Sequence, residues 1–489
     1  MAALAAMVPA CRSSSEPTGS LDALKVSPGT LQPSFTSGGH DYGIICAEGK
    51  NSWNLSATPR DSQSKVTFAG AGPNGQIDVT ENQVVTVNVT KPDSTNDTYY
   101  VRCLPHDFPR FSITRDGQGA KPGFYLLAPN VNDPNNGHYL TILDEFGAAL
   151  WYQKTPWPAA NLRKLPNGNM YWIPLLGGSG YGTEPDGYGR ESNLDGALLH
   201  SWKPVGNPPD YHDVRPLPNG DMLVTGYRMR NQVDVSALAP EFTGLWNVVD
   251  ASLQEILPDG SVAWQWHSED HIGLTETVAQ KNKEMGIDPF STLDLVHPNS
   301  IEVTPEGDLI LSTRHTDAVY KIRKNPGQPD DGKIIWKLGG VPPTEKGARH
   351  LQIIDDPYGG PARQHWARLL PNGHLTMFDN RTNKRNQPAR VVEYELNEEE
   401  GTAKMVWQYE AEDRANSGFF GSYQRLPDGS HVIGWGGMSP VLSELTPDGE
   451  RVLRIVSIGT FTNFSVTKEP PEAFDKAMLR DKAGKAKLT

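Results

Sequence analysis

The sequence predicts an all-β protein in which a small β-sandwich precedes a six-bladed β-propeller. Three observations predict this class. The chain of 489 residues contains 48 Gly and 40 Pro, a turn content typical of many short strands rather than long helices. Apolar and polar residues alternate at a period of two in short segments. Two kinds of turn also alternate along most of the chain, which indicates a repeat architecture.

The composition excludes two classes of partner. The chain carries 45 Lys and Arg against 58 Asp and Glu, a formal net charge of -13. An acidic surface repels phosphate backbones, so we expect no nucleic-acid partner. No run of about 18 apolar residues occurs, so we expect membrane contact only through a lipid anchor.

Residues 1–19 are expected to be an export signal followed by a lipoprotein tether. An Ala-rich apolar segment, 1–10, leads to Cys11, and a Ser-rich polar stretch follows. This order is typical of a signal that ends at a lipid-modified cysteine, which would place the protein at a cell surface or in a periplasm. The alternative is an unstructured N-terminus in which the Cys11 thiol is incidental.

Residues 20–108 are expected to form the β-sandwich. Segments 65–69, 83–89 and 98–103 alternate apolar and polar side chains. Gly, Pro and Asn interrupt such segments about every 8–12 residues, the spacing of a sandwich. Cys46 and Cys103 both lie in strand-like sequence, and a disulfide between them would cross-link the domain in an oxidising compartment. Alternatively, both are buried free thiols.

Residues 109–467 are expected to form the propeller. One recurring unit is a turn such as Leu-Pro-Asn-Gly before a Leu- or Ile-rich strand, and the other is a turn Gly followed by a Trp. The two units alternate from Gly123 to Gly449 as six pairs of hairpins, which predicts six four-stranded blades. The alternative is two or three separate sandwiches with similar hairpins. Residues 468–489 are expected to be a basic, solvated tail.

Three histidines share one position in successive blades. His212 and His365 each precede the Gly of the first turn in their blade by eight residues. His297 precedes its turn by ten, an even offset that keeps the same face of a strand. The first strand of each blade lines the central channel, so we expect the three imidazoles to face one another. Imidazole serves as a nucleophile or an acid/base near neutral pH.

Three arginines are expected beside these histidines. Arg314 lies seven residues beyond its turn, and Arg228 and Arg381 lie eight beyond theirs. Antiparallel pairing returns these positions to the open end of each hairpin, near Asn299. Forked guanidinium donors suit a tetrahedral oxyanion, so we predict a pocket in which Asn299, Arg228 and Arg381 bind substrate. His315 is expected to point to the opposite side of its strand and to be structural.

Two other functions stay open. Converging imidazoles on a propeller axis would suit a metal-dependent enzyme with iron or zinc. Against this, Arg314 would repel a divalent cation, and neither a fourth His nor an obvious carboxylate shares the register. We therefore expect no metal ligand in the chain. The second alternative is a non-catalytic binding propeller at the cell surface, in which the matched histidines are inert.

Several of these segments resemble the arylsulfate sulfotransferase family. The similar segments are 294–301 (Asp-Leu-Val-His-Pro-Asn-Ser-Ile), 309–314 (Leu-Ile-Leu-Ser-Thr-Arg), 334–340, 364–365, 370–375 and 378–380. The resemblance covers most of residues 120–460. It implies a six-bladed propeller behind a small β-domain, and a possible homodimer.

The resemblance also implies a reaction: PAPS-independent transfer of a sulfuryl group from an aryl sulfate donor to a phenolic acceptor. His365 matches the histidine that becomes sulfated in a ping-pong mechanism. The residues that match groups holding the sulfuryl oxygens are His212, His297, Asn299 and Arg314. Either His212 or His297 would protonate the leaving phenolate. The chain contains no Gly-rich phosphate-binding motif, so we expect no nucleotide donor and no cofactor.

Overall fold

The computed structural model describes residues 19–72, 75–117, 119–131, 135–176, 187–238, 244–278, 292–382, 384, 386–459 and 461–485. The chain divides into two compact units, Met1–His106 and Asp107–Thr489. The predicted lipidation site, Cys11, and the signal around it lie outside the described residues. Within the described ranges, no helix combines the length and apolar character needed to cross a membrane.

The first unit contains two sheets around one apolar core. In the described residues their strand orders are β1 (Leu21–Ser27), β3 (Lys50–Pro59), β5 (Gln76–Thr80) and β2 (Asp41–Ile45), β7 (Asn96–Leu104), β6 (Val84–Thr90), β4 (Lys65–Phe68). Every second side chain of β6 is buried, and these valines pack in the same core as Trp53 and Tyr99. The alternation read from the sequence therefore reflects strands with one buried face.

A disulfide joins Cys46 and Cys103 in this unit. Cys46 directly follows β2, Cys103 lies in β7, and their Cα atoms are 5.6 Å apart. The structure confirms the predicted disulfide, so the alternative of two free thiols is wrong. A disulfide is compatible with an exported protein.

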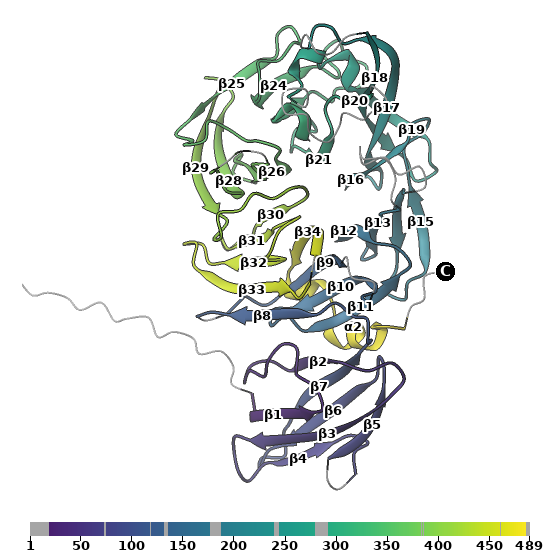
Figure 1. Cartoon of the computed structure of the whole chain (residues 1–489), viewed down its shortest axis with the longest axis vertical. Helices are drawn as coiled ribbons and strands as arrows, with labels where there is room; N and C mark the ends of the chain where they lie inside the picture. Colours follow the sequence, from purple (N-terminus) through teal and green to yellow (C-terminus); the bar gives the residue numbers. More distant parts are fainter. Residues whose placement is uncertain are drawn as a thin grey trace, which may run out of the picture. The chain divides into compact units, whose positions relative to one another are not determined.

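The second unit consists of mainly antiparallel sheets arranged around a centre, and β25 joins two of their strand groups through parallel pairs (Figure 1). The first three groups in the described residues are β34 (Phe461–Glu469), β9 (Phe124–Val131), β10 (His138–Asp144), β11 (Ala149–Thr155); β12 (Ala159–Lys164), β13 (Met170–Pro174), β14 (Gly189–Ser192), β15 (Leu198–Trp202); and β16 (Pro209–Pro216), β17 (Met222–Asp234), β18 (Leu245–Ile256), β19 (Val262–His267), with β20 (Thr292–Asp294) parallel to β18.

Two further groups share one nine-stranded sheet, and a last group includes the strand that begins the unit. In the described ranges they are β21 (Pro298–Val303), β22 (Leu309–Thr313), β23 (Ala318–Ile322), β24 (Ile334–Gly339), joined through β25 (Arg349–Ile354) to β29 (Thr402–Glu410), β28 (Arg390–Asn397), β27 (Leu375–Asp379), β26 (His365–Leu369); and β30 (Ser422–Arg425), β31 (His431–Gly434), β32 (Leu442–Leu445), β33 (Arg451–Ser457), β8 (Phe111–Arg115).

The innermost strands of these groups form a ring. Successive neighbours in the order β12, β16, β21, β26, β30 and β34 contact one another, and β34 contacts β12. The all-β class and its propeller-like sheets are therefore confirmed. The count of six blades stays a prediction, which this ring of described strands supports.

Both ends of the second unit's chain close this ring. The late strand β34 supplies the inner edge of the sheet that begins with β9, and the early strand β8 pairs with β33. Figure 1 shows β8, drawn in blue, beside the yellow β33. Closure by strands from both ends leaves fewer unpaired sheet edges.

The recurring Gly turns have the predicted geometry. Gly220 has φ +90° and Gly373 has φ +82°, and each donates its backbone N–H back to the Leu that begins the turn. Nothing lies within 4 Å of a Cβ built at either glycine, so backbone conformation, not crowding, selects glycine there.

The C-terminal segment differs from the expected solvated tail. After β34 the described chain forms the turn Pro471–Ala473 and the helix α2 (Lys476–Lys482). Phe474 and Leu479 are buried in the core that contains Phe124 and Trp151. These two apolar residues anchor the segment to the core. The sequence did not predict this because two apolar residues among many lysines form too short a pattern.

Candidate active site

The three matched histidines meet at one end of the central channel. His212 lies in β16, His365 begins β26, and His297 directly precedes β21. The ring centroid of His212 is 4.8 Å from that of His297 and 6.4 Å from that of His365. All three side chains are buried. The three histidines that occupy matching positions relative to their turns are therefore close together in space.

Two acceptors define the tautomer of His365. Its Nδ1 lies 3.1 Å from the carbonyl oxygen of Arg363 and 2.7 Å from Oδ1 of Asn380. The Asn380 amide is oriented because its Nδ2 donates to the carbonyl of Phe420 at 2.8 Å. Both neighbours of Nδ1 accept, so Nδ1 carries the proton and Nε2 keeps its lone pair.

The charge state of His365 suits a nucleophile. Burial lowers its pKa well below the ordinary value, and the neighbouring His212 and Arg314 lower it further. The ring is therefore neutral at neutral pH, with an available lone pair on Nε2. An unprotonated imidazole is the form that attacks an electrophile.

A carboxylate supports His212. Its Nδ1 lies 2.5 Å from Oδ1 of Asp210, two residues earlier on the same face of β16. Asp210 in turn accepts a hydrogen bond of 2.7 Å from the hydroxyl of Thr225. Such a carboxylate orients the imidazole and stabilises its protonated form.

A second carboxylate supports His297. Its Nδ1 lies 2.5 Å from Oδ2 of Asp294, and the same oxygen is 3.4 Å from Nδ1 of His315. Burial raises the pKa of Asp294 to about 6, an effect that His315 partly opposes. Burial lowers the pKa of His297 well below its usual value, and His212 and Arg314 add to this.

Arg314 faces this group from the short 3₁₀ turn Arg314–Thr316. Its guanidinium donates to Nε2 of His315 at 3.1 Å and to the carbonyl of Gly418 at 3.2 Å. It also lowers the pKa of His297 and His365, which shows that its charge acts on both rings. A cation held beside a nucleophile attracts an anionic substrate.

His315 differs from the expectation. It was predicted to point away from the site, yet its ring centroid lies 4.7 Å from that of His297. The period-two rule fails because residues 314–316 form a 3₁₀ turn instead of continuing β22. His315 bridges Arg314 and the backbone carbonyl of Asp294, so it fixes the guanidinium in place.

Asn299 lies on β21 with its side chain buried. Its Nδ2 donates to the carbonyl of Gln364 at 2.6 Å, and its buried Oδ1 has no hydrogen-bond partner among the described residues. An amide nitrogen has two hydrogens, so one remains for a ligand after the bond to Gln364.

Two predicted substrate-binding arginines have other contacts. Arg228 forms an ion pair with Glu269 at 3.1 Å. Arg381 donates to the carbonyl of Gly360 at 2.6 Å, contacts Asp379 at 3.3 Å and covers the ring of Tyr358. In the described residues neither guanidinium contacts the three histidines. The number of residues from a turn predicts the position of a residue along a strand. It does not predict the direction of a side chain at or beyond the end of that strand.

Aromatic side chains flank the histidines. The ring of Tyr211 stacks on His212 at 4.4 Å, and Phe464 from β34 lies 5.8 Å from the same imidazole. Phe420 lies 4.8 Å from Phe464 and 6.4 Å from Tyr211. These three residues, the aromatic wall, offer faces and edges to an aryl group beside the histidines.

Sequence reasoning missed the carboxylates and amide behind the rings. Asp210 precedes His212 by two residues and Asp294 precedes His297 by three, so local spacing carried a signal. The expectation concerned only carboxylates at the same register as the histidines, so it did not consider Asp210 and Asp294, which precede that register. Asn380, which comes from the paired strand's end, had no such local signal.

One cluster in the described residues could hold a metal ion. Ligand atoms of Asp294, His297 and His315 lie within 4.8 Å of one another. However, His315 accepts from Arg314 at Nε2 and faces a backbone carbonyl through Nδ1, so neither nitrogen has a lone pair to give. The donor set therefore fits a metal ion poorly.

Comparison with known proteins gives one family. The model of a family described as Arylsulfotransferase (ASST) matches residues 112–463, which include all the residues of this site except Phe464. No curated protein matches the chain.

Similar solved structures include three bacterial proteins. One is a protein of unknown function from Bacteroides caccae (12% identity, TM-score 0.42, covering 71% of this chain and 99% of that chain). Another is a protein from Lactobacillus plantarum (13%, TM-score 0.37, 70% and 83%). The third is a virginiamycin B lyase from Staphylococcus aureus with quinupristin (10%, TM-score 0.35, 74% and 89%). These scores are too low to carry an argument.

Proposed function

The chain belongs to the arylsulfotransferase family, and we propose that it moves a sulfuryl group from a phenolic sulfate ester to a phenol through a sulfated His365. The family supports aryl sulfotransferase activity in general. One observation carries the finer proposal. The Nδ1 atom of His365 is held by two acceptors, which leaves the Nε2 lone pair available in a buried site near Arg314.

The first half of the proposed reaction loads the enzyme. Nε2 of His365 attacks sulfur, the bond between sulfur and the aryl oxygen breaks, and the electron pair leaves with the phenolate. Arg314 and the amide of Asn299 hold the sulfuryl oxygens while charge redistributes. The aromatic wall receives the aryl ring, which explains why a phenol rather than an alkyl alcohol is the leaving group.

We assign proton transfer to His212. Two guanidinium groups, Arg314 and Arg363, disfavour a cationic His297. His297 shares its carboxylate, Asp294, with His315, whereas Asp210 is the carboxylate beside Nδ1 of His212 and can balance a second proton on that ring. His212 donates that proton to the departing phenolate and later removes one from the acceptor phenol, whose oxygen then displaces His365 from sulfur. One pocket serves donor and acceptor in turn, so the kinetics are ping-pong.

The experiment uses a chromogenic nitrophenyl sulfate donor and a phenol acceptor, with no nucleotide present. Donor alone should add one sulfuryl mass to the peptide that contains His365, and His365→Ala should lose both the label and the transfer. His350→Ala is the matched control because His350 is exposed and bonds only to a backbone carbonyl in the described residues. Full transfer by His365→Ala, or label on another residue, would defeat the proposal.

Donors with leaving phenols of graded acidity test the assignment of the proton. The rate loss in His212→Asn should increase as the leaving phenol becomes less acidic and should be small for nitrophenol. The loss in His297→Asn should be the same for every donor. If instead the rate loss depended on the donor in His297→Asn and not in His212→Asn, His297 would be the acid/base.

The metal cluster provides a separate test. Elemental analysis of purified protein should find no stoichiometric transition metal, and transfer should survive chelation. Loss of activity under chelation with recovery on adding one metal would favour the metal-dependent alternative. The disulfide is compatible with export, and lipid anchoring through Cys11 stays a proposal.

A further inference from the structure

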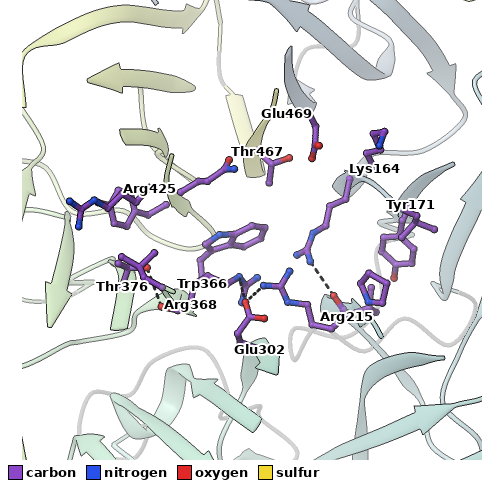
Figure 2. A pocket seen from close by; sticks show the side chains of 17 residues that line it. Lys164, Tyr171, Arg215, Glu302, Trp366, Arg368, Thr376, Arg425, Thr467 and Glu469 are labelled. Carbon is purple, nitrogen blue, oxygen red and sulfur yellow. Dashed lines mark hydrogen bonds and ion pairs between the residues drawn. The ribbon is translucent and has the colours of Figure 1, made fainter. Parts of the chain in front are cut away.

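A cavity lies at the end of the central channel opposite the histidines. Its volume is about 320 Å³, and it adjoins the hairpin turns, whereas the histidines lie where the inner strands begin. We call it the distal pocket, and it is lined by Arg163, Arg215, Glu302, Trp366, Arg368 and Leu370, among others. Figure 2 shows Glu302 facing Arg215 and Arg368, with the indole of Trp366 beside them.

Positive charge exceeds negative charge in this pocket. Asp213 contacts Arg163 at 2.6 Å and Arg368 at 2.8 Å. Glu302 pairs with Arg215 and lies 3.7 Å from Nε of Arg368. Three guanidinium groups thus share two carboxylates, which leaves one net positive charge.

The rim does not offset this charge. Lys164 faces Glu469, and Arg425 pairs with Glu393 at 2.8 Å, so each rim cation has its own carboxylate. Burial lowers the pKa of Arg368 to about 9, and the neighbouring Arg215 contributes. A buried cation that lacks compensation is costly, and a bound anion would relieve that cost.

A hydrogen-bond donor in the pocket also lacks an acceptor. The Nε atom of Arg163 is buried and has no partner among the described residues, although its other two nitrogens bind Val214, Asn161 and Asp213. A buried N–H without an acceptor is unfavourable.

The walls of the pocket are partly apolar. Leu165, Leu370 and Pro216 line it together with the charged groups. The indole of Trp366 lies between Arg163 and Arg368, with its ring centroid 4.6 Å and 4.2 Å from their guanidinium carbons. Apolar walls around a cationic centre favour an organic anion over a hydrated inorganic one.

We propose that the distal pocket binds a small organic molecule with one oxyanion group, either a carboxylate or a sulfate monoester. The single net charge of the cluster sets the charge of the ligand, and the apolar walls accommodate its body. This site is separate from the histidines, so the proposal does not rest on sulfuryl transfer. Trp366 directly follows His365 and lies between the two ends of the channel.

The test is isothermal titration calorimetry with benzoate. It uses two substitutions that change the net charge of the pocket in opposite directions. Arg215→Gln removes the net positive charge and should weaken benzoate binding by at least about tenfold, whereas Glu302→Gln doubles it and should strengthen binding by about tenfold. General misfolding would weaken binding in both variants. Arg323→Gln and Glu306→Gln are matched controls, because they make the same charge changes at residues that do not line the pocket.

Three outcomes would overturn the proposal. They are no benzoate binding at millimolar concentrations, the same direction of change in both variants, and displacement of benzoate by an equal concentration of chloride. Phenyl sulfate titrated into His365→Ala protein distinguishes the two oxyanion sources. Tighter binding of phenyl sulfate than of benzoate to this pocket assigns it to sulfate esters, and the reverse assigns it to carboxylates.

Discussion

The two ends of the channel are lined by the same inner strands but differ in how they balance charge. At the end with His212 and His365, each ring is backed by one carboxylate or amide, and burial keeps His365 neutral. At the distal pocket, guanidinium groups and carboxylates remain ionised and bridge strands; Asp213 contacts both Arg163 and Arg368. Polar side chains at the start of the inner strands therefore form the candidate active site, whereas those at the other end form ion pairs that join neighbouring strands.

The largest expected effect tests the first end. Arg314→Ala should lower kcat/KM for an aryl sulfate donor by about 10³-fold, because it removes the cation that we propose holds the sulfuryl oxygens. Arg314→Lys should recover part of this loss, since it restores charge without the forked geometry. Steady-state kinetics provide the measurement.

The control for that prediction is Arg323→Ala, whose side chain is half-exposed and pairs with Asp308. Its kcat/KM should stay within about twofold of the unmodified protein, because Arg323 belongs to neither site among the described residues. If Arg314→Ala behaved like this control, the sulfuryl-binding role of Arg314 would be excluded.

The next prediction tests how much the ion pairs of the distal pocket stabilise the fold. Asp213→Asn should lower the free energy of unfolding by about 3–5 kcal/mol, because it leaves Arg163 and Arg368 buried without their carboxylate. Burial alone would raise the pKa of Asp213, but these arginines outweigh it and lower the pKa to about 2. The measurement is denaturant unfolding of both proteins at several pH values.

The pH window of this difference follows from the sign of the shift. A carboxyl group with a lowered pKa stabilises the fold above its unfolded pKa of about 3.9, and the contribution disappears as pH falls toward the folded value. The difference between the two proteins should be constant from neutral pH to about pH 4 and then shrink. A difference that disappeared already near pH 6 would point instead to histidine titration.

A third prediction concerns the tautomer at the histidine end. Asn380→Ala should slow sulfation of His365 by about 10- to 100-fold, because the ring loses the acceptor that holds its Nδ1 proton. Asn380→Asp should instead raise the pKa of His365, since a carboxylate favours the imidazolium. The acidic limb of the rate profile should then move to higher pH, as the nucleophile protonates earlier.

The unmodified protein sets the reference for that shift. Because burial lowers the pKa of His365, its acidic limb should lie below about pH 6.5, the ordinary value for histidine. A purely structural role for Asn380 would change stability in both variants but leave the position of the limb unaltered.

The smallest effect tests the aromatic wall. Phe464→Leu should raise KM for aryl donors by about two- to tenfold, because it removes a ring contact but keeps apolar volume. Single-turnover kinetics should show an unchanged rate of sulfation at saturating donor. Leu426→Val, at a turn outside both sites, is the control. Equal KM values for the variant and the unmodified protein would place the aryl group elsewhere.

Much of the architecture followed from the sequence because turns and period-two strands are local signals. The register of His212, His297 and His365 relative to their turns predicted their convergence, since blades repeat the same geometry. Predictions failed where the backbone leaves that pattern. The 3₁₀ turn at Arg314 reoriented His315, and Arg228 and Arg381 extend from strand ends into other contacts. The charged cluster of the distal pocket combines side chains from four strands, β12, β16, β21 and β26, and residue spacing within one segment cannot predict such a cluster.

The strand β34 has a consequence for how the protein is made. It supplies Phe464 to the aromatic wall and closes the sheet that starts with β9. The chain must therefore be synthesised through β34 before the aromatic wall has its Phe464 side chain. Until then the edge of β9 that pairs with β34 stays unpaired, and an unpaired strand edge can associate with other chains.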